Sequence, residues 1–310
     1  MSKYILKRLL LSIITIWAVI TITFVLMNAI PGNPFANENR RIPENIYENL
    51  MKKYGLDKPK SEQYITYLKN IAKFDFGESM RSDTETVNEM INRGFPVSAT
   101  LGFEALLISL IFGPALGAIA ALYQNKAPDY ISMIISIIGV SVPSFLMGTF
   151  LIQFVATKFD WIPIGGWGEF RHTILPSITL AMMPLAQISR LMRSGMLEVL
   201  NQDYLKTARS KGLAGSVVIM KHAVRNAILP IISILGTTIS DLLTGSFVVE
   251  KIFGIPGMGM FFINSVFNRD YTLIMGVAVF YAIVLIIMML LVDIAYTLVD
   301  PRIRLAKGGH

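Results

Sequence analysis

The sequence predicts an all-α membrane protein with six transmembrane helices. Of its 310 residues, 53% are hydrophobic and only 16% are charged, whereas about 25% of the residues in a soluble domain are charged. The apolar residues gather in six long runs with almost no charge, and a bilayer core about 30 Å thick needs about 20 apolar helical residues to cross it. This composition argues against a disordered chain and against an ordinary soluble enzyme.

The six predicted spans follow one another along the chain. The first run follows Lys3, Lys7 and Arg8, as the core of a signal peptide would. However, it is longer than the usual 7–15 residues and no A-x-A cleavage site follows it, so we interpret it as a retained span. The fourth run is the shortest and the weakest helix candidate, because it contains Pro176, Pro184 and Gln187. The spans cover roughly residues 9–30, 101–123, 131–156, 174–191, 227–249 and 272–298.

The distribution of lysine and arginine orients these spans. With the N-terminus inside, the inner segments hold 14 Lys and Arg, and the short outer segments hold four. The remaining outer segment, residues 31–98, has 68 residues, and loops beyond about 60 residues escape the positive-inside rule. The count predicts a multi-pass protein of the cell membrane (inner or plasma membrane) with both termini in the cytoplasm.

Residues 31–98 form a polar region in which apolar residues recur at helical spacing, as at Tyr64, Tyr67, Leu68 and Ile71. We expect a small, mostly helical insert outside the membrane. The predicted organisation is therefore a first span with this insert, a five-helix unit and a cytoplasmic tail. Their bounds are 1–96, 97–298 and 299–310.

A short basic helix is predicted on the inner side, between the fourth and fifth spans. Asn201 or Asp203 can cap its N-terminus, and Gly212 can take the left-handed conformation that ends it. Tyr204 and Ala208 are four residues apart, so they share one face, which suits docking into a groove of a partner protein. The alternative is a basic helix held at anionic lipid headgroups.

Several motifs, in order along the whole chain, resemble one family. They include Asp203-Tyr204, Thr207-Ala208-Arg209, Lys211-Gly212-Leu213, His222-Ala223, Arg225-Asn226-Ala227 and Leu229-Pro230, and also Pro31-Gly32-Asn33-Pro34, Asp75-Phe76-Gly77-Glu78-Ser79, Pro256-Gly257 and Asp300-Pro301-Arg302. The chain is similar to the permease subunits of binding-protein-dependent ABC importers, specifically the B-type subunit of the dipeptide/oligopeptide branch. Thr207-Ala208-Arg209 stands where the broader superfamily has Glu-Ala-Ala, which agrees with the peptide branch.

The resemblance implies the type I ABC importer permease fold. It also implies that the short inner helix, in a loop of about residues 193–226, is a coupling helix that sits in a cleft of an ATPase subunit. The coupling residues implied are Asp203, Tyr204, Thr207, Ala208, Arg209, Lys211, Gly212 and Leu213. The outer gate loop implied contains Glu250, Phe253, Pro256, Gly257 and Gly259.

The resemblance further implies the partners of the chain. They are a second homologous permease subunit, two ATPase subunits that bind ATP and magnesium, an extracytoplasmic substrate-binding protein, a peptide and membrane lipid. The sequence contains no Gly-x-x-x-x-Gly-Lys-Ser/Thr segment, so we expect neither an ATPase site nor a cofactor in this chain. The net charge of +7 lies in blocks between apolar runs, so no nucleic acid partner is expected.

Polar residues inside the spans are candidates for the translocation path, because burying an unpaired charge in a bilayer is costly. Asp241 lies deep in the fifth predicted span among hydroxyl side chains. Glu104 lies about one turn inside the outer end of the second, where it can also snorkel to the headgroups. A small polar kink is predicted in the third span. The candidates are Asp241, Thr237, Thr238, Ser240, Ser141, Pro143, Ser144 and Glu104.

Two other functions remain as alternatives. Nickel or a metal chelate is the other substrate that the same branch suggests, although free metal favours clustered His, Cys or Met ligands. The chain has three His, no Cys and 17 scattered Met, so no metal site is predicted. A membrane enzyme is a more distant alternative, because no nucleophile and base lie at one depth.

Overall fold

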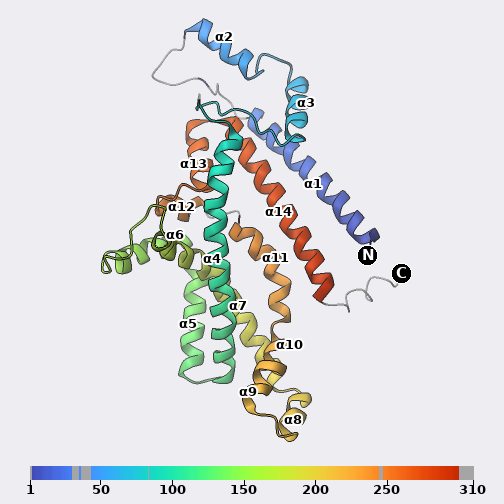
Figure 1. The fold of residues 1–310 in the computed structure, drawn as a ribbon, viewed down its shortest axis with the longest axis vertical. Coiled ribbons are helices and arrows are strands. Elements are labelled where there is room, and N and C mark those ends of the chain that lie inside the picture. The colour runs from blue at the N-terminus through green and yellow to red at the C-terminus, as the bar shows by residue number, and fades with distance from the viewer. Residues whose placement is uncertain (1, 30–34, 36–42, 83, 244–246, 300–310) are drawn as a thin grey trace. The chain divides into compact units, whose positions relative to one another are not determined.

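The computed structural model describes residues 2–29, 35, 43–82, 84–243 and 247–299. Secondary structure within these ranges is helical, apart from an isolated bridge between Glu78 and Thr86. The predicted all-α class is therefore confirmed (Figure 1). The Pro31-Gly32-Asn33-Pro34 motif and residues 300–310 of the predicted tail lie outside the described residues.

Among the described residues, five helical segments are long and apolar enough to cross a membrane, and one bent pair of helices makes a sixth. Five or six candidate spans therefore follow one another in the predicted order, and the sixth depends on counting the bent pair as one span. The five segments are α1 (Ser2–Ala29), α4 (Val87–Leu122), α7 (Phe170–Leu200), α14 (Tyr271–Val299) and the stretch Leu229–Ile252, which contains α11 (Leu229–Leu243) and α12 (Phe247–Ile252).

The third predicted span is broken rather than kinked. It consists of α5 (Ala127–Ser141) and of α6 (Ser144–Leu151) with the π-helical turn η1 (Ile152–Ala156), and the two parts are bent by 113°. Pro143 explains the break, because a residue before proline is driven out of the helical conformation. Val142, which precedes it, has φ −88° and ψ 119°.

The chain divides into two compact units, and the first comprises Met1–Phe95 and Met260–Ile286. It contains α1, α2 (Glu44–Lys53), α3 (Lys60–Ile71) and most of α13 (Met258–Asn268), so the insert is helical as predicted. α3 packs on α1, since the rings of Tyr64 and Tyr67 lie 5.3 and 5.9 Å from that of Phe24.

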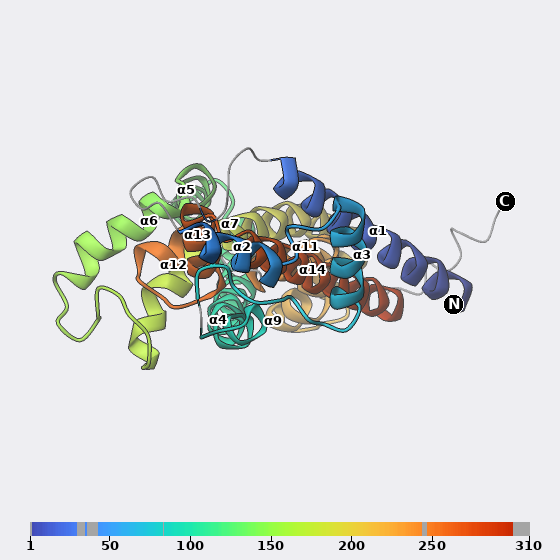
Figure 2. The same cartoon turned by 90° about the horizontal axis from the view of Figure 1, so that it is seen from above.

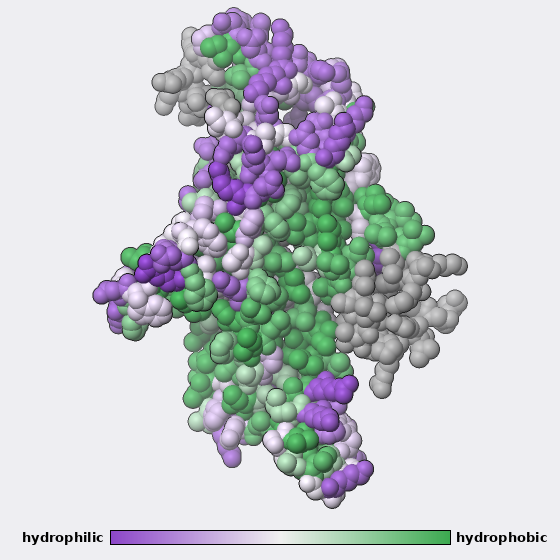
Figure 3. All heavy atoms as spheres, viewed as in Figure 1, coloured by the Kyte–Doolittle hydropathy of each residue, from purple (hydrophilic) through white to green (hydrophobic). Residues whose placement is uncertain are grey.

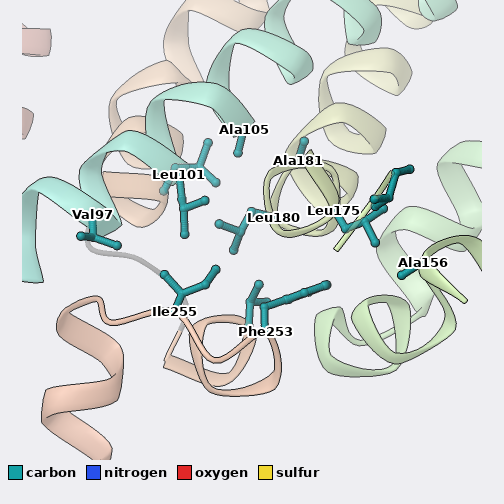
Figure 4. Close-up of a cluster of buried hydrophobic side chains, with 12 residues drawn as sticks. Val97, Leu101, Ala105, Ala156, Leu175, Leu180, Ala181, Phe253 and Ile255 are labelled. Carbon is teal, nitrogen blue, oxygen red and sulfur yellow. The ribbon is translucent and has the colours of Figure 1, made fainter. Parts of the chain in front are cut away.

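The second unit, Pro96–Gly259 with Ile287–His310, is built around α7. The helices α5, α6 and α11 pack against α7, and α5 lies beside it in both views of the ribbon (Figures 1 and 2). A buried apolar cluster joins α4, α7 and the segment after α12 (Figure 4). Its labelled members are Val97, Leu101, Ala105, Ala156, Leu175, Leu180, Ala181, Phe253 and Ile255.

Glycines let neighbouring backbones approach α7 closely. A Cβ atom on Gly117 of α4 would collide with the α7 backbone. A Cβ atom on Gly139 of α5 would lie 2.7 Å from the carbonyl oxygen of Met182, and one on Gly195 of α7 would lie 2.8 Å from that of Ala227. Small residues at helix contacts are typical of membrane bundles, where van der Waals packing drives association.

Candidate coupling loop and outer turn

The loop between α7 and α11 contains four short helical segments. They are α8 (Asp203–Ser210), α9 (Gly215–Val217), the π-helical η2 (Val218–Val224) and α10 (Arg225–Ala227). On the face drawn in Figure 3, hydrophilic side chains lie among hydrophobic ones around α8, whereas mostly hydrophobic side chains cover α4, α5 and α11.

α8 forms where the sequence predicts a helix, but its first turn is not capped as predicted. Its N-cap residue is Gln202, and no side chain caps it. Asn201 belongs to the end of α7, where its amide donates to the carbonyl oxygen of Leu197 (3.0 Å). The prediction that Asn201 or Asp203 caps α8 is therefore wrong. Asn201 is the C-cap residue of α7, and Asp203 is the first residue inside α8.

The end of α8 confirms the predicted left-handed conformation of Gly212, whose φ is +77°. The Gly212 amide donates to the carbonyl oxygen of Arg209 (3.0 Å), and the Leu213 amide donates to that of Ala208 (3.4 Å). Together these hydrogen bonds form a Schellman motif, which satisfies two carbonyl groups at the helix end. A Cβ atom on Gly212 would meet nothing within 4 Å, so a substitution there acts through the backbone alone.

The apolar side of α8 is packed into the core of its own chain. Leu205 is fully buried and Ala208 is only 8% exposed. Both belong to a cluster that includes Met192 and Met196 of α7 and Ala223 of η2. The predicted docking face is therefore corrected: Ala208 cannot share an exposed face with Tyr204, because α7 and η2 cover its side of the helix.

The other predicted coupling residues are exposed. Tyr204 is 41% exposed, and its hydroxyl accepts a hydrogen bond from the side-chain amide of Asn226 (2.8 Å). Lys206 pairs with Asp203 (2.8 Å) on the surface, where an ion pair contributes about 0–1 kcal/mol. α8 thus presents a polar, basic surface on a buried apolar base. The exposed set is Asp203, Tyr204, Thr207, Arg209, Lys211, Gly212 and Leu213.

At the end of the second unit opposite to α8 (Figure 1), Glu250 of α12 forms a buried network. Glu250 is 0% exposed; its Oε1 accepts a hydrogen bond from the Ser98 hydroxyl (2.7 Å) and its Oε2 one from the Gly259 amide (2.7 Å). The Ser98 hydroxyl accepts one from the Met258 amide (2.9 Å). Since Met258 and Gly259 begin α13, the carboxylate lies at a helix N-terminus, which favours negative charge.

Two of the other predicted outer gate residues, Gly257 and Gly259, lie against this carboxylate. A Cβ atom on Gly257 would collide with the Glu250 carboxylate, and one on Gly259 would lie 2.8 Å from its Oε2. Phe253 is buried, and its carbonyl accepts a hydrogen bond from the Gly166 amide (2.8 Å). Pro256 is exposed. Glu250, Gly257 and Gly259 therefore lie together in one tight turn, in which neither glycine position has room for a side chain.

The candidate path residues of the fifth span do not lie on one face. Thr237 and Asp241 are exposed, whereas Thr238 and Ser240 are buried. The hydroxyls of Thr238 and Ser240 donate to carbonyl oxygens one turn earlier in α11 (2.9 Å each). Thr238 and Ser240 are therefore covered by the chain, and their hydroxyls are satisfied within the helix.

The remaining path candidates lie in two places. Glu104 is half-buried and accepts a hydrogen bond from the Ser177 hydroxyl of α7 (2.7 Å), so a neighbouring helix holds it. Ser141, Pro143 and Ser144 are exposed at the break between α5 and α6. These candidates thus lie at the contact between α4 and α7 and at the break between α5 and α6.

Sequence reasoning missed three polar interactions, which are Ser98 with Glu250, Ser177 with Glu104, and Asp129 with Arg193. Ser98 and Ser177 gave no signal, because a hydroxyl in an apolar run does not reveal its acceptor. Asp129 of α5 and Arg193 of α7 form an ion pair (2.7 Å) in which the Asp129 side chain is 1% exposed, although both appeared only as charges of the inner segments. Within the described ranges, no group of three His, Asp or Glu side chains could hold a metal ion.

Comparisons with known proteins agree over the whole chain. The model of the family "Binding-protein-dependent transport system inner membrane component" matches residues 113–305, and the model of its N-terminal part matches residues 1–102. The dipeptide transport system permease protein DppB of Bacillus subtilis is 50% identical over 309 residues, with 100% of both chains covered. The oligopeptide transport system permease protein OppB of Haemophilus influenzae is 42% identical over 306 residues, with 98% of this chain and 100% of the relative covered.

A solved structure shows the same fold. An inward-facing form of the MetNI methionine ABC transporter matches with a TM-score of 0.51 and 15% identity, covering 66% of this chain and 92% of that one. The predicted importer permease fold is thereby confirmed. The family models, the relatives and this structure together show that the chain belongs to the family of binding-protein-dependent transport system inner membrane components. It is a multi-pass transport subunit and not an enzyme.

Proposed function

We propose that this chain is a permease subunit of an ATP-driven importer for dipeptides or oligopeptides, and that α8 couples it to an ATPase. One observation carries the coupling role: the apolar side of α8 is fixed in the core of the chain while its basic side is exposed. Because α8 is packed against α7, a displacement of α8 by a bound partner also displaces α7. The full-length relatives, named for dipeptide and oligopeptide transport, support the substrate class.

The proposed complex contains a second homologous permease, two ATPase subunits and an extracytoplasmic binding protein. ATP and magnesium bind to the ATPase subunits, and this chain supplies half of the translocation path. ATP binding favours the outward-facing state, into which the binding protein releases peptide, and hydrolysis resets the complex. Such alternation requires that ATP and peptide bind the two states with different affinities.

The proposed orientation places α8 and both termini in the cytoplasm, and α2 and α3 outside. The excess of Lys and Arg in the inner segments supports it. Because the chain has no cysteine, a single Cys at Glu44, the first residue of α2, reports its side directly. We expect an impermeant thiol reagent to label it from outside in intact cells. Labelling only from the cytoplasmic side would overturn the orientation.

Uptake by the complete importer tests the substrate. In a host without other peptide importers, cells that express this chain with its partner subunits should accumulate a labelled dipeptide or oligopeptide, and a partner ATPase inactivated in its phosphate loop should abolish uptake. Nickel uptake without peptide uptake would assign the chain to a nickel or metal-chelate importer instead. The purified chain alone should not hydrolyse ATP, and turnover by it would contradict the proposal.

A further inference from the structure

We propose that the ion pair between Asp129 and Arg193 is an inner clamp that carries movement of α8 into α5. The proposal rests on the coupling role proposed for α8. The Asp129 side chain is almost fully buried, and its two oxygens accept hydrogen bonds from Arg193 Nε (2.7 Å) and Nη2 (2.8 Å). The Asn125 amide donates a third (3.0 Å). A bidentate pair fixes the relative orientation of the two side chains as well as their distance.

The clamp lies on the turn of α7 that also holds α8. Arg193 is flanked by Met192 and Met196, which are both 0% exposed. These methionines pack in the same cluster as Leu205 and Ala208 of α8. A displacement of α8 must therefore move this turn of α7, and Arg193 moves with it.

The clamp also binds α5 to α7 at the end far from the break. Near the other end of α5, Gly139 approaches the α7 backbone at Met182 and Ala186. With one fixed contact near each end, α5 follows α7 as a single body. The residues that come next are the exposed ones at the break, where the chain bends by 113° before α6. Movement of α8 is thus delivered to Ser141, Pro143 and Ser144, which are candidates for the translocation path.

Stability alone does not account for a charged pair at this position. A well-packed apolar pair of similar volume often stabilises a buried site as well or better. An apolar contact, however, can slide or rotate, whereas the two parallel hydrogen bonds of Arg193 permit one geometry. The pair therefore acts as a positioning device between two helices.

The test uses the complete importer and measures peptide transported per ATP hydrolysed. Asp129→Asn keeps the shape of the side chain and removes its charge, and Arg193→Lys keeps the charge and removes the fork. We expect both to assemble and to hydrolyse ATP, with the ratio of peptide to ATP lowered about 5-fold or more. Exchanging the two residues, Asp129→Arg with Arg193→Asp, should restore part of the ratio. Glu198→Gln, which makes the same charge change at an exposed position of α7, should leave it unchanged.

A purely structural role gives a different result. The variants would then yield less assembled complex, but each assembled complex would transport peptide with the wild-type ratio, and that outcome would overturn the clamp. If Asp129→Asn fails to assemble, Arg193→Lys and the exchanged pair decide, each normalised to the amount of complex. A wild-type importer that takes up no peptide would refute the proposed function instead.

Discussion

Two carboxylates at opposite ends of the second unit show how differently one chemical group can be used. The side chain of Asp203 in α8 is 92% exposed and pairs with Lys206, three residues away. Glu250 is 0% exposed and binds Ser98, which is 152 positions away in the sequence. The first carboxylate acts locally and is screened by water. The second holds distant segments together and depends on every donor around it.

The contrast distinguishes the exposed side of α8, where side chains interact only with near neighbours and water, from the buried network around Glu250, where each hydrogen bond links distant segments. On the exposed side of α8, side chains can be replaced without disturbing the chain beneath them. Around Glu250, a lost hydrogen bond leaves a buried group without a partner, which costs about 1–3 kcal/mol for each group. Substitutions that make the same chemical change at a buried position and at an exposed position test this comparison.

The largest effect is expected for Glu250→Gln. The new amide places a donor where the Ser98 hydroxyl or the Gly259 amide requires an acceptor, so the chain should lose about 3 kcal/mol of stability. Thermal unfolding of the protein in detergent measures this, together with the amount of correctly inserted chain. Wild-type unfolding behaviour would contradict the buried network.

Ala208→Glu should have the next largest effect, because it forces a larger, charged side chain into the cluster beneath α8. We expect a loss of about 2 kcal/mol, with peptide uptake reduced as α8 is displaced. Thr207→Glu adds the same charge on the exposed side and serves as the matched control. It should leave stability unchanged and reduce co-purification of the ATPase subunits.

The variants Ala208→Glu and Thr207→Glu also distinguish docking of α8 on an ATPase subunit from anchoring of α8 at lipid headgroups. If α8 only rests on anionic headgroups, Thr207→Glu weakens that attraction by about 1 kcal/mol and leaves association with the ATPase subunits intact. Equal loss of stability in both variants would mean that the buried and exposed sides of α8 are assigned wrongly.

Gly212→Val should have a smaller effect on stability than Glu250→Gln or Ala208→Glu. The left-handed backbone costs a residue with a Cβ atom about 1 kcal/mol or more, and Cβ contacts add nothing at this position. Because the turn sets the angle of α8, uptake should fall while the chain still inserts. Asn adopts this conformation more readily than Val, so uptake by Gly212→Asn should stay near wild type. Equal uptake by both variants would exclude the turn from coupling.

The smallest effect is expected for Asp203→Asn, which makes at the exposed end the same change as Glu250→Gln makes at the buried end. An exposed pair three residues apart on a helix contributes about 0.3 kcal/mol. Thermal unfolding at low and high salt should show a small difference that salt removes. A loss comparable to that of Glu250→Gln would contradict the comparison.

Local signals in the sequence predicted the elements that depend on near neighbours. The six apolar runs predicted the spans, because the bilayer sets the length and composition of a crossing helix. Gly212 predicted the end of α8, because the left-handed position strongly favours glycine. The start of α8 was missed by one residue, because the N-cap is Gln202 and Asn201 instead belongs to the end of α7.

Contacts between distant residues were not predictable in the same way. Helical spacing predicts that Tyr204 and Ala208 share one face of α8, but it does not reveal that α7 and η2 cover Ala208. Likewise, Glu250 was recognised as part of an outer loop, whereas its partner Ser98 lies in another helix and is an ordinary residue there. Pro143 signalled a kink, but the size of the bend depends on how α6 packs against α7.

The close approach of glycine-bearing helices to α7 bears on how the protein is assembled in the membrane. Of the five candidate spans other than the bent pair, α7 is the least apolar and the most buried, so it gains less than the other four from contact with lipid. The helices that contribute Gly117 and Gly139 precede it in the chain and are synthesised first. We therefore expect α7 to enter the bilayer late and against α4 and α5, with insertion efficiency that depends on those two glycines rather than on its own hydrophobicity.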